Sequence, residues 1–241
     1  MSFAAIRKRA VGAARNYFVR QLDAESLLNL DDVAPYVRHH LNRMYFTLFF
    51  ASGSSAIGSH LSSSIGSSWS AFGAFICIAL FSSTKPWKEY TRAFIFILGS
   101  FFGGALLAPW FIWLVQFNTD FVVTSTLAIG IGFFSFWTAN NWVDRFECVY
   151  FAAMAIYVPL ALTCLLFDPA YGGLTDIWSY PIYAVLMWNM VYVMAYSQEV
   201  KVKVRKGDFD YVRHAVNLYT DLPPVYITVA MELASDFVNN I

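Results

Sequence analysis

Asp221 is the side chain whose type and position point most directly to chemistry. It lies well inside the last apolar stretch, shortly after the polar segment Gly207–Asp210. A charge at membrane depth is costly, so an ionisable residue there marks a functional site by default. Intramembrane aspartyl proteolysis needs two facing carboxylates. Glu199 and Glu232 lie at the ends of apolar stretches, so the sequence offers Asp221 as an ion or proton site and not as a protease.

Other catalytic arrangements are absent from the sequence. A zinc hydrolase needs three protein ligands, but His39 and His40 precede the first apolar stretch and His214 lies at the base of the last. No phosphate-binding loop, dinucleotide fingerprint or Ser/His/Asp arrangement is visible. We therefore expect that the protein is not an enzyme and that it holds neither a metal site nor a cofactor.

The composition places these residues in a membrane. The chain has 241 residues, of which 58% are hydrophobic and 13% charged, whereas a soluble domain carries about a quarter charged residues. Its mean hydropathy is +0.51. Successive apolar windows of roughly 20 residues are each long enough to span a bilayer. We predict an all-α polytopic membrane protein with bound lipids and with no separate soluble domain.

Seven apolar stretches supply the helices that position Asp221. They cover about 44–61, 69–83, 93–115, 121–140, 148–167, 179–198 and, more weakly, 214–234. We expect a short polar turn at 62–68 and a basic loop at 201–206. Gly and Ser in the first stretch, and a GxxxG pattern at Gly99 and Gly103, predict close helix packing. The predicted organisation is a basic amphipathic region, 1–42, followed by a seven-span membrane domain, 43–241.

The basic residues occur in blocks between these stretches. They fall within 7–43, 85–92, at Arg145 and within 201–213. By the positive-inside rule, this places the N-terminus and the basic loops on the cytosolic or matrix side. Because each block flanks an apolar stretch, nucleic-acid binding is not expected. The first 22 residues are Arg-rich and lack acids, which fits either a mitochondrial presequence or a surface helix on an anionic leaflet.

The segment that leads to Asp221 resembles the C-terminal signature of the Bax inhibitor-1 family. The matching residues are Gly207-Asp208-Phe209-Asp210-Tyr211, His214-Ala215 and Leu218-Tyr219-Thr220-Asp221, with a further resemblance at His40-Leu41-Asn42-Arg43. The resemblance implies a six- to seven-helix bundle with the last helix central, in an intracellular membrane that is usually the endoplasmic reticulum. It also implies suppression of cell death and a pH-sensitive calcium leak gated by two membrane aspartates that share a proton.

One of these two aspartates is absent here. Asp221 matches the second, but the position of the first falls on Tyr196. Glu199 is about one helical turn from Tyr196, and Tyr196 can donate a hydrogen bond to Asp221. The resemblance and this departure together predict an impaired leak. Pro223 and Pro224 follow; they either kink a packed helix or free carbonyls that form a hard-cation site with Asp221.

Two functions are therefore predicted. The first is a Bax inhibitor-1-like regulator of cell death with calcium passage near Asp221, Tyr196 and Glu199. The alternative is a non-catalytic accessory subunit of a larger complex, such as one in the mitochondrial inner membrane. In that case membrane-protein partners would bind through the N-terminal region, 1–35.

Overall fold

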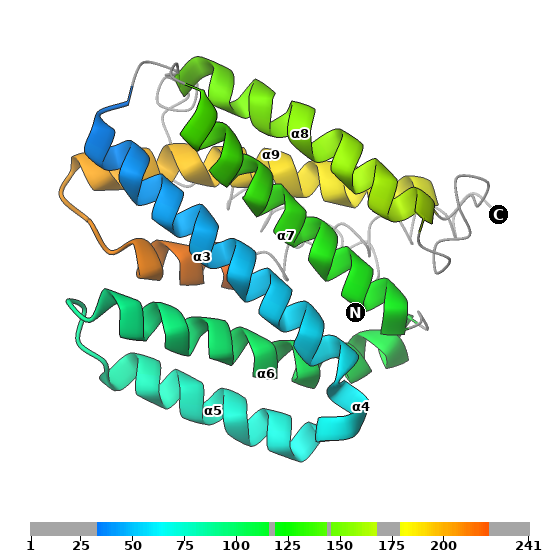
Figure 1. The fold of residues 1–241 in the computed structure, drawn as a ribbon. Helices are drawn as coiled ribbons and strands as arrows, with labels where there is room; N and C mark the ends of the chain where they lie inside the picture. Colours follow the sequence, from blue (N-terminus) through cyan, green and yellow to red (C-terminus); the bar gives the residue numbers. More distant parts are fainter. Residues whose placement is uncertain (1–32, 116–118, 144–145, 168–178, 222–241) are drawn as a thin grey trace, which may run out of the picture.

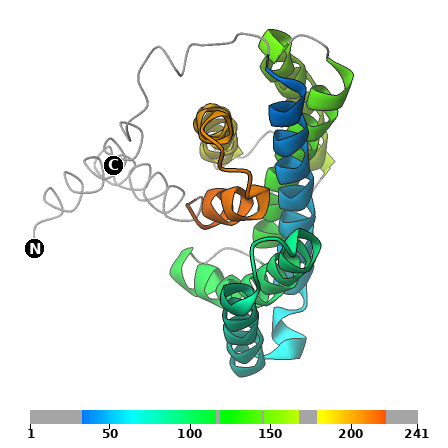
Figure 2. The same cartoon turned by 90° about the vertical axis from the view of Figure 1, so that its left-hand side faces the viewer.

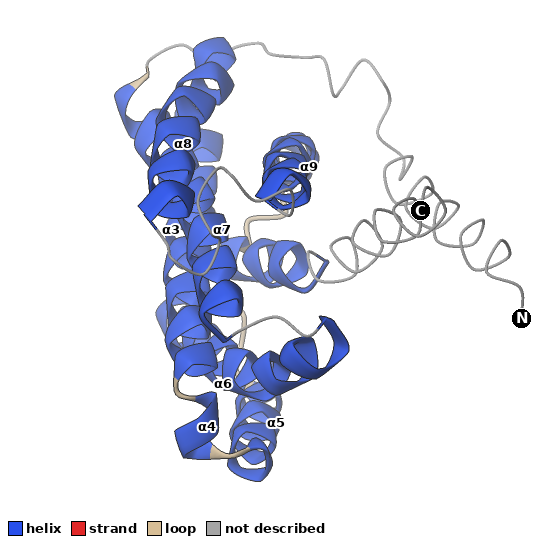
Figure 3. Ribbon diagram, turned by 90° about the vertical axis from the view of Figure 1, so that its right-hand side faces the viewer, coloured by secondary structure: helices blue, strands red, loops and turns tan. Residues whose placement is uncertain are grey.

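The structure is a computed structural model that describes residues 33–115, 119–143, 146–167 and 179–221. Within these ranges the chain is helical and contains no strand, as Figure 3 shows. A further helical segment covers residues 211–221. The labelled helices are α3 (Pro35–His60), α4 (Ser62–Ile65), α5 (Ser67–Ser83), α6 (Glu89–Val115), α7 (Thr119–Trp142), α8 (Phe146–Phe167) and α9 (Ser179–Arg205). The predicted all-α fold class is confirmed, whereas the helix count and the central position of the last helix stay predictions, because residues 222–241 lie outside the described part of the chain.

Helix α3 lies at the centre of the arrangement (Figure 1). It packs between α7 and α6, while α8 covers α7 and α5 covers α6. Figure 2 shows α9 and the segment 211–221 together on one side of the layer that contains α3 and α7. The hydrophobic core runs through α3, α6, α7, α8, α9 and the segment 211–221, and it includes fully buried Leu41, Phe136, Met190 and Leu218.

Small residues bring α3 and α6 into direct backbone contact. A Cβ atom on Gly58 would lie 2.0 Å from the carbonyl oxygen of Phe101, and one on Gly104 would lie 2.1 Å from that of Ser55. The Ser59 hydroxyl donates to the carbonyl of Gly104 at 3.2 Å. The expected Gly/Ser packing is therefore present, because only a missing Cβ permits this approach.

Only one glycine of the predicted GxxxG pattern makes a close helix contact. A Cβ atom on Gly103 would meet nothing within 4 Å. Gly99 faces Cys77 of α5, at 3.3 Å from the position of such a Cβ atom. The next residue, Gly104, is the one that meets α3. Adjacent residues on a helix differ by about 100° in direction, so the pattern alone did not identify the face.

Two predicted loops are partly helical. The expected polar turn at 62–68 contains the short helix α4 and ends at Gly66, which has φ +80°. Most of the expected basic loop at 201–206 is the last part of α9, which continues to Arg205. Lys201 there is only 2% exposed. No Gly or Pro interrupts residues 182–206, so nothing local ends the helix before Gly207.

Two of the described helices are long and apolar enough to cross a bilayer, at Glu89–Trp110 and Val122–Trp142. Shorter apolar helices cover Ser67–Ser83 and Cys148–Thr163. The seven-span organisation and the division at residue 42 stay predictions. The N-terminal segment 1–32 and the Pro223–Pro224 pair lie outside the described residues.

Candidate functional site

The signature segment begins with the turn that ends α9. Gly207 has φ +96°, a conformation that side chains with a Cβ disfavour. Its N–H donates to the Val204 carbonyl at 3.0 Å, and the N–H of Asp208 donates to the Lys203 carbonyl at 3.1 Å. These are the two bonds of a Schellman motif. Gly207 therefore ends α9 and turns the chain back toward the bundle.

Asp210 starts the next helical segment and also joins it to α6. Its Oδ1 accepts the backbone N–H of Arg213 at 3.0 Å, as an N-cap residue does. Its Oδ2 lies 2.5 Å from Nη1 of Arg92. The side chain of Arg92 is 8% exposed and that of Asp210 is 18% exposed. One carboxylate therefore caps the segment and forms a largely buried ion pair with a distant helix.

Asp208 and two histidines make a second connection. Nε2 of His40, on α3, lies 3.0 Å from Nδ1 of His214. Nε2 of His214 lies 3.3 Å from Oδ2 of Asp208, within ion-pair distance but outside hydrogen-bond geometry. His40 is 6% exposed and His214 1%. The single 3.0 Å contact uses one donor and one acceptor, so it fits two neutral imidazoles.

The protonation of His40 is controlled by this environment. His40 precedes the predicted first span. Burial and the neighbouring imidazole of His214 lower the pKa of His40 from 6.5 to about 4, although the charges of Asp208 and Asp210 act in the opposite direction. His40 is therefore neutral at pH 7, and acid places a charge inside the cluster.

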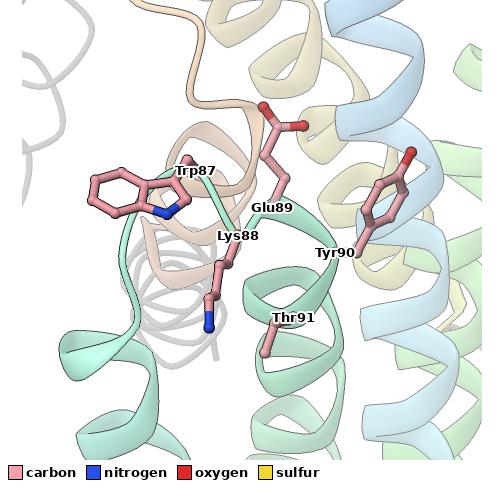
Figure 4. Close-up of a pocket in the computed structure, with 5 residues that line it drawn as sticks. All are labelled: Trp87, Lys88, Glu89, Tyr90 and Thr91. Carbon is pink, nitrogen blue, oxygen red and sulfur yellow. The ribbon is translucent and has the colours of Figure 1, made fainter.

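A more exposed ion pair lies near the histidine pair. Arg43 of α3 and Glu89 of α6 lie 3.1 Å apart, and the Arg43 guanidinium lies 5.7 Å from the centroid of the Tyr211 ring. Beside them is a pocket of about 350 Å³ lined by Trp87, Lys88, Glu89, Tyr90 and Thr91 (Figure 4). Exposed aromatic rings with charges of both signs are typical of the headgroup level of a bilayer.

We use the name latch cluster for His40, Arg43, Glu89, Arg92, Asp208, Asp210, Tyr211 and His214. It brings together residues of α3, of α6, of the turn after α9 and of the segment 211–221. The predicted motif residues Gly207, Asp208, Asp210, Tyr211 and His214 all lie in it or next to it. Among the described residues, no group of His, Cys, Asp and Glu has the arrangement to hold a metal ion. The cluster is suited to holding and releasing a helical segment by charge.

The three predicted ion-site residues, Tyr196, Glu199 and Asp221, have different surroundings. Tyr196 is 4% exposed, and its hydroxyl donates to the backbone carbonyl of His214 at 3.2 Å. Glu199 pairs with Lys203 at 2.5 Å along α9. Asp221 is half-buried at the last described residue of its segment. Tyr196 thus joins α9 to the segment that carries Asp221; its predicted hydrogen bond to Asp221 stays a prediction.

The sequence did not identify four members of the cluster as site residues, namely His40, Arg43, Glu89 and Arg92. His40 and Arg43 belong to the second segment that resembles the family, and Glu89 and Arg92 lie within the basic block at 85–92. A usable signal existed for Arg92, because this cation directly precedes the apolar stretch at 93–115. Its burial at 6% exposed requires a partner charge, and only the folded chain shows that the partner is Asp210.

The fold and the latch cluster together define the class of protein. It is an all-helical bundle with membrane-type helices, whose last described segment is joined to other helices by buried ionisable groups. No protein-family model and no solved structure matches the chain at a significant level. Known sequences do match over most of its length.

The chain is 26% identical over 213 residues to Bax inhibitor 1 of Arabidopsis thaliana, which covers 87% of this chain and 86% of that protein. It is 28% identical over 208 residues to Bax inhibitor 1 of Oryza sativa, with 85% and 84% covered. It is 23% identical over 203 residues to Bax inhibitor 1 of Drosophila melanogaster, with 80% of each covered. These matches confirm the predicted resemblance and support membership of the Bax inhibitor-1 family.

Proposed function

We propose that the protein is an integral membrane regulator of cell death that acts through a pH-responsive cation leak. The observation that carries this proposal is the latch cluster, which anchors the segment bearing Asp221 to α3 and α6 through Asp210–Arg92 and His40–His214. The relatives over most of the chain's length carry the name Bax inhibitor 1, which supports the cell-death role.

In this proposal the segment 211–221 is the moving element. At pH 7 the histidine pair is neutral and the buried ion pair is intact, so the segment stays docked. Acid protonates the pair, and two neighbouring imidazolium groups repel each other beside Arg43. Release of the segment exposes the carboxylate of Asp221 to the cation path, and calcium is the cation it would pass.

The leak is expected to be weak. Tyr196 occupies the position at which the family resemblance expects an acid, and a tyrosine ordinarily loses its proton only near pH 10. It therefore cannot share a titrating proton with Asp221 near neutral pH. Restoring the acid with Tyr196→Asp should increase the leak and its response to pH.

Calcium flux from loaded liposomes tests this function. Wild-type protein should leak more at pH 4 than at pH 7.5, since the pKa of His40 is about 4, and Asp221→Asn should lose most of the difference. Thr220→Val is the matched control, because the exposed Thr220 hydroxyl is bonded to the carbonyl of Val216 in its own helix. If Asp221→Asn and wild type leak identically at every pH, the channel function is wrong.

An accessory role in a larger membrane complex is the second candidate. The observation that favours it is Tyr196, whose buried hydroxyl bonds the backbone of His214 and so connects two helices. In this role the fold is a rigid scaffold, and the N-terminal region contacts partner subunits. Co-migration with a large assembly after gentle solubilisation supports this role; migration as a single chain counts against it.

The two proposed roles predict different compartments for the protein. The leak function predicts the endoplasmic reticulum, and the accessory role predicts the mitochondrial inner membrane. In both, the N-terminus and the basic loops face the cytosol or the matrix. Organelle fractionation with a C-terminal tag, together with protease protection of the tag and of the loop at 85–88, distinguishes the two compartments and reports the sidedness.

A further inference from the structure

A groove lined mainly by α7, with one residue of α8, contains no residue of the latch cluster. Its volume is about 450 Å³, and its lining consists of Phe134, Trp137, Thr138, Asn141, Trp142 and Ile156. The α7 residues 134, 137, 138 and 141 follow the spacing of one helix face. From Phe134 to Trp142 the groove extends about 12 Å along the helix. It therefore runs inward from the end of a predicted span.

Thr138 provides an unused polar group in this groove. The residue is 8% exposed, and its hydroxyl has no hydrogen-bond partner. Thr126, three turns earlier on the same helix, bonds the carbonyl of Val122 at 2.7 Å. A buried hydroxyl without a partner costs about 1–3 kcal/mol. The Thr138 oxygen is itself buried, so a rotation of this side chain toward the groove would let a ligand that gives and accepts a hydrogen bond satisfy it.

The outer end of the groove is polar but carries no free charge in its lining. Asn141 and Asn42 exchange side-chain hydrogen bonds of 3.0 and 3.1 Å. Arg38 lies nearby, but its guanidinium Nε is committed to the carbonyl of Asn140 at 2.7 Å and another of its nitrogens donates to the carbonyl of Val143. The six lining residues are all uncharged. This end matches an uncharged hydroxyl better than a phosphate group.

Aromatic rings of α3 pack against two of the aromatic residues that line the groove. The rings of Phe134 and Trp137 lie 5.7 Å apart. Phe46 lies 5.6 Å from Trp137, and Phe49 lies 5.3 Å from Phe134. Such rings give a broad, stiff apolar surface. It suits a rigid, flat hydrocarbon body more than a flexible acyl chain, which loses more conformational entropy when it is held.

We infer that the α7–α8 groove is a binding site for a sterol, whose single hydroxyl bonds Thr138 and Asn141 while its fused rings lie on Phe134 and Trp137. This inference does not rest on the proposed leak. Trp142 is 80% exposed and would close over the hydroxyl end at the headgroup level, where tryptophan is favoured.

Photolabelling of the full chain in phosphatidylcholine vesicles tests the site. A diazirine-bearing sterol should label a peptide containing Phe134–Trp142, and excess unlabelled sterol should compete. Thr138→Val should lower this labelling about fivefold, the change expected from loss of one net hydrogen bond. Thr138→Ser keeps the hydroxyl and should label like wild type.

Two controls separate this site from general lipid contact. Thr126→Val makes the same substitution on the same helix outside the groove and should change nothing. Trp142→Ala should weaken labelling, whereas Trp69→Ala, which removes another exposed tryptophan (71% exposed) on α5, should not. Each variant is compared at equal recovery of folded protein by size-exclusion chromatography.

Three results would overturn the sterol site. The first is labelling of Phe134–Trp142 that excess sterol does not reduce. The second is equal labelling of Thr138→Val and Thr126→Val. The third is a diazirine phospholipid that labels the groove as strongly as the sterol probe and is displaced by phospholipid alone, which would make the groove an ordinary acyl-chain contact.

Discussion

The carboxylate of Asp210 lies 2.5 Å from the guanidinium of Arg92, although the two residues are 118 positions apart. The same carboxylate caps the helical segment 211–221 through its other oxygen. Arg92 is almost buried and Asp210 is partly buried, so loss of either partner leaves an uncompensated charge. The start of the last segment is thus fixed by a contact between its first turn and the first turn of α6.

Asparagine and alanine at position 210 should separate the two roles of Asp210. Asp210→Asn keeps a good N-cap but strands the Arg92 charge, and a broken buried pair costs about 3–5 kcal/mol. Asp210→Ala should cost about 1 kcal/mol more, because the cap is lost as well. Thermal unfolding in detergent measures both. The double variant Arg92→Met with Asp210→Asn should recover most of the stability; no recovery would mean that the pair is not the cause.

Gly207→Ala should destabilise the turn that positions the latch cluster. A Cβ atom at Gly207 would meet nothing within 4 Å, so the expected cost of about 1–2 kcal/mol comes from φ +96° alone. Gly207→Asn should cost less, because asparagine tolerates positive φ better than alanine does. Unfolding midpoints of the two variants check this order, and an alanine variant as stable as wild type would contradict it.

Gly104→Ala and Gly103→Ala should differ sharply although the residues are neighbours. A Cβ atom on Gly104 would lie 2.1 Å from the Ser55 carbonyl oxygen, whereas one on Gly103 would meet nothing within 4 Å. Overpacking of this kind costs about 1–3 kcal/mol or more. The alanine at 103 should be neutral or slightly stabilising, since alanine favours helix. Equal unfolding midpoints would show that α3 and α6 do not approach each other as described.

Acid should weaken the fold through His40. Its pKa is lowered to about 4, so the unfolded chain binds more protons than the folded one between pH 6.5 and 4. The stability that depends on neutral His40 is therefore complete above pH 6.5 and is lost as the pH falls toward 4. The ionisable groups that act on the histidine pair are Arg43, Lys203, Asp208 and Asp210.

The variant His40→Gln isolates this effect. Glutamine takes up no proton, so the loss of stability between pH 7 and pH 4 should be smaller than in wild type by about 1–2 kcal/mol, after allowance for solvent screening. Unfolding midpoints across that pH range measure the difference. His39→Gln is the control on the same helix and should follow wild type. Parallel curves for all three proteins would exclude His40 as the acid-sensitive group.

The helices could largely be predicted from the sequence, and the reason is local. Apolar stretches at 69–83 and 148–167 became α5 and α8 within two residues at each end, because length and hydropathy alone specify a membrane-type helix. Where a helix end depends on a capping turn, prediction was poorer. The start of α3 and the end of α9 extend beyond the apolar stretches. A helix can begin at a proline such as Pro35, and it continues until a residue such as Gly207 ends it.

By itself the sequence determined the helical class and the family signature, since each follows from residue type and near neighbours. Tertiary structure alone decided which glycine of α6 meets α3, that Arg92 pairs with Asp210, that His40 meets His214 and that Tyr196 binds the His214 carbonyl. These contacts join residues far apart along the chain. No periodic pattern records them, because they depend on how whole helices are rotated and packed against one another.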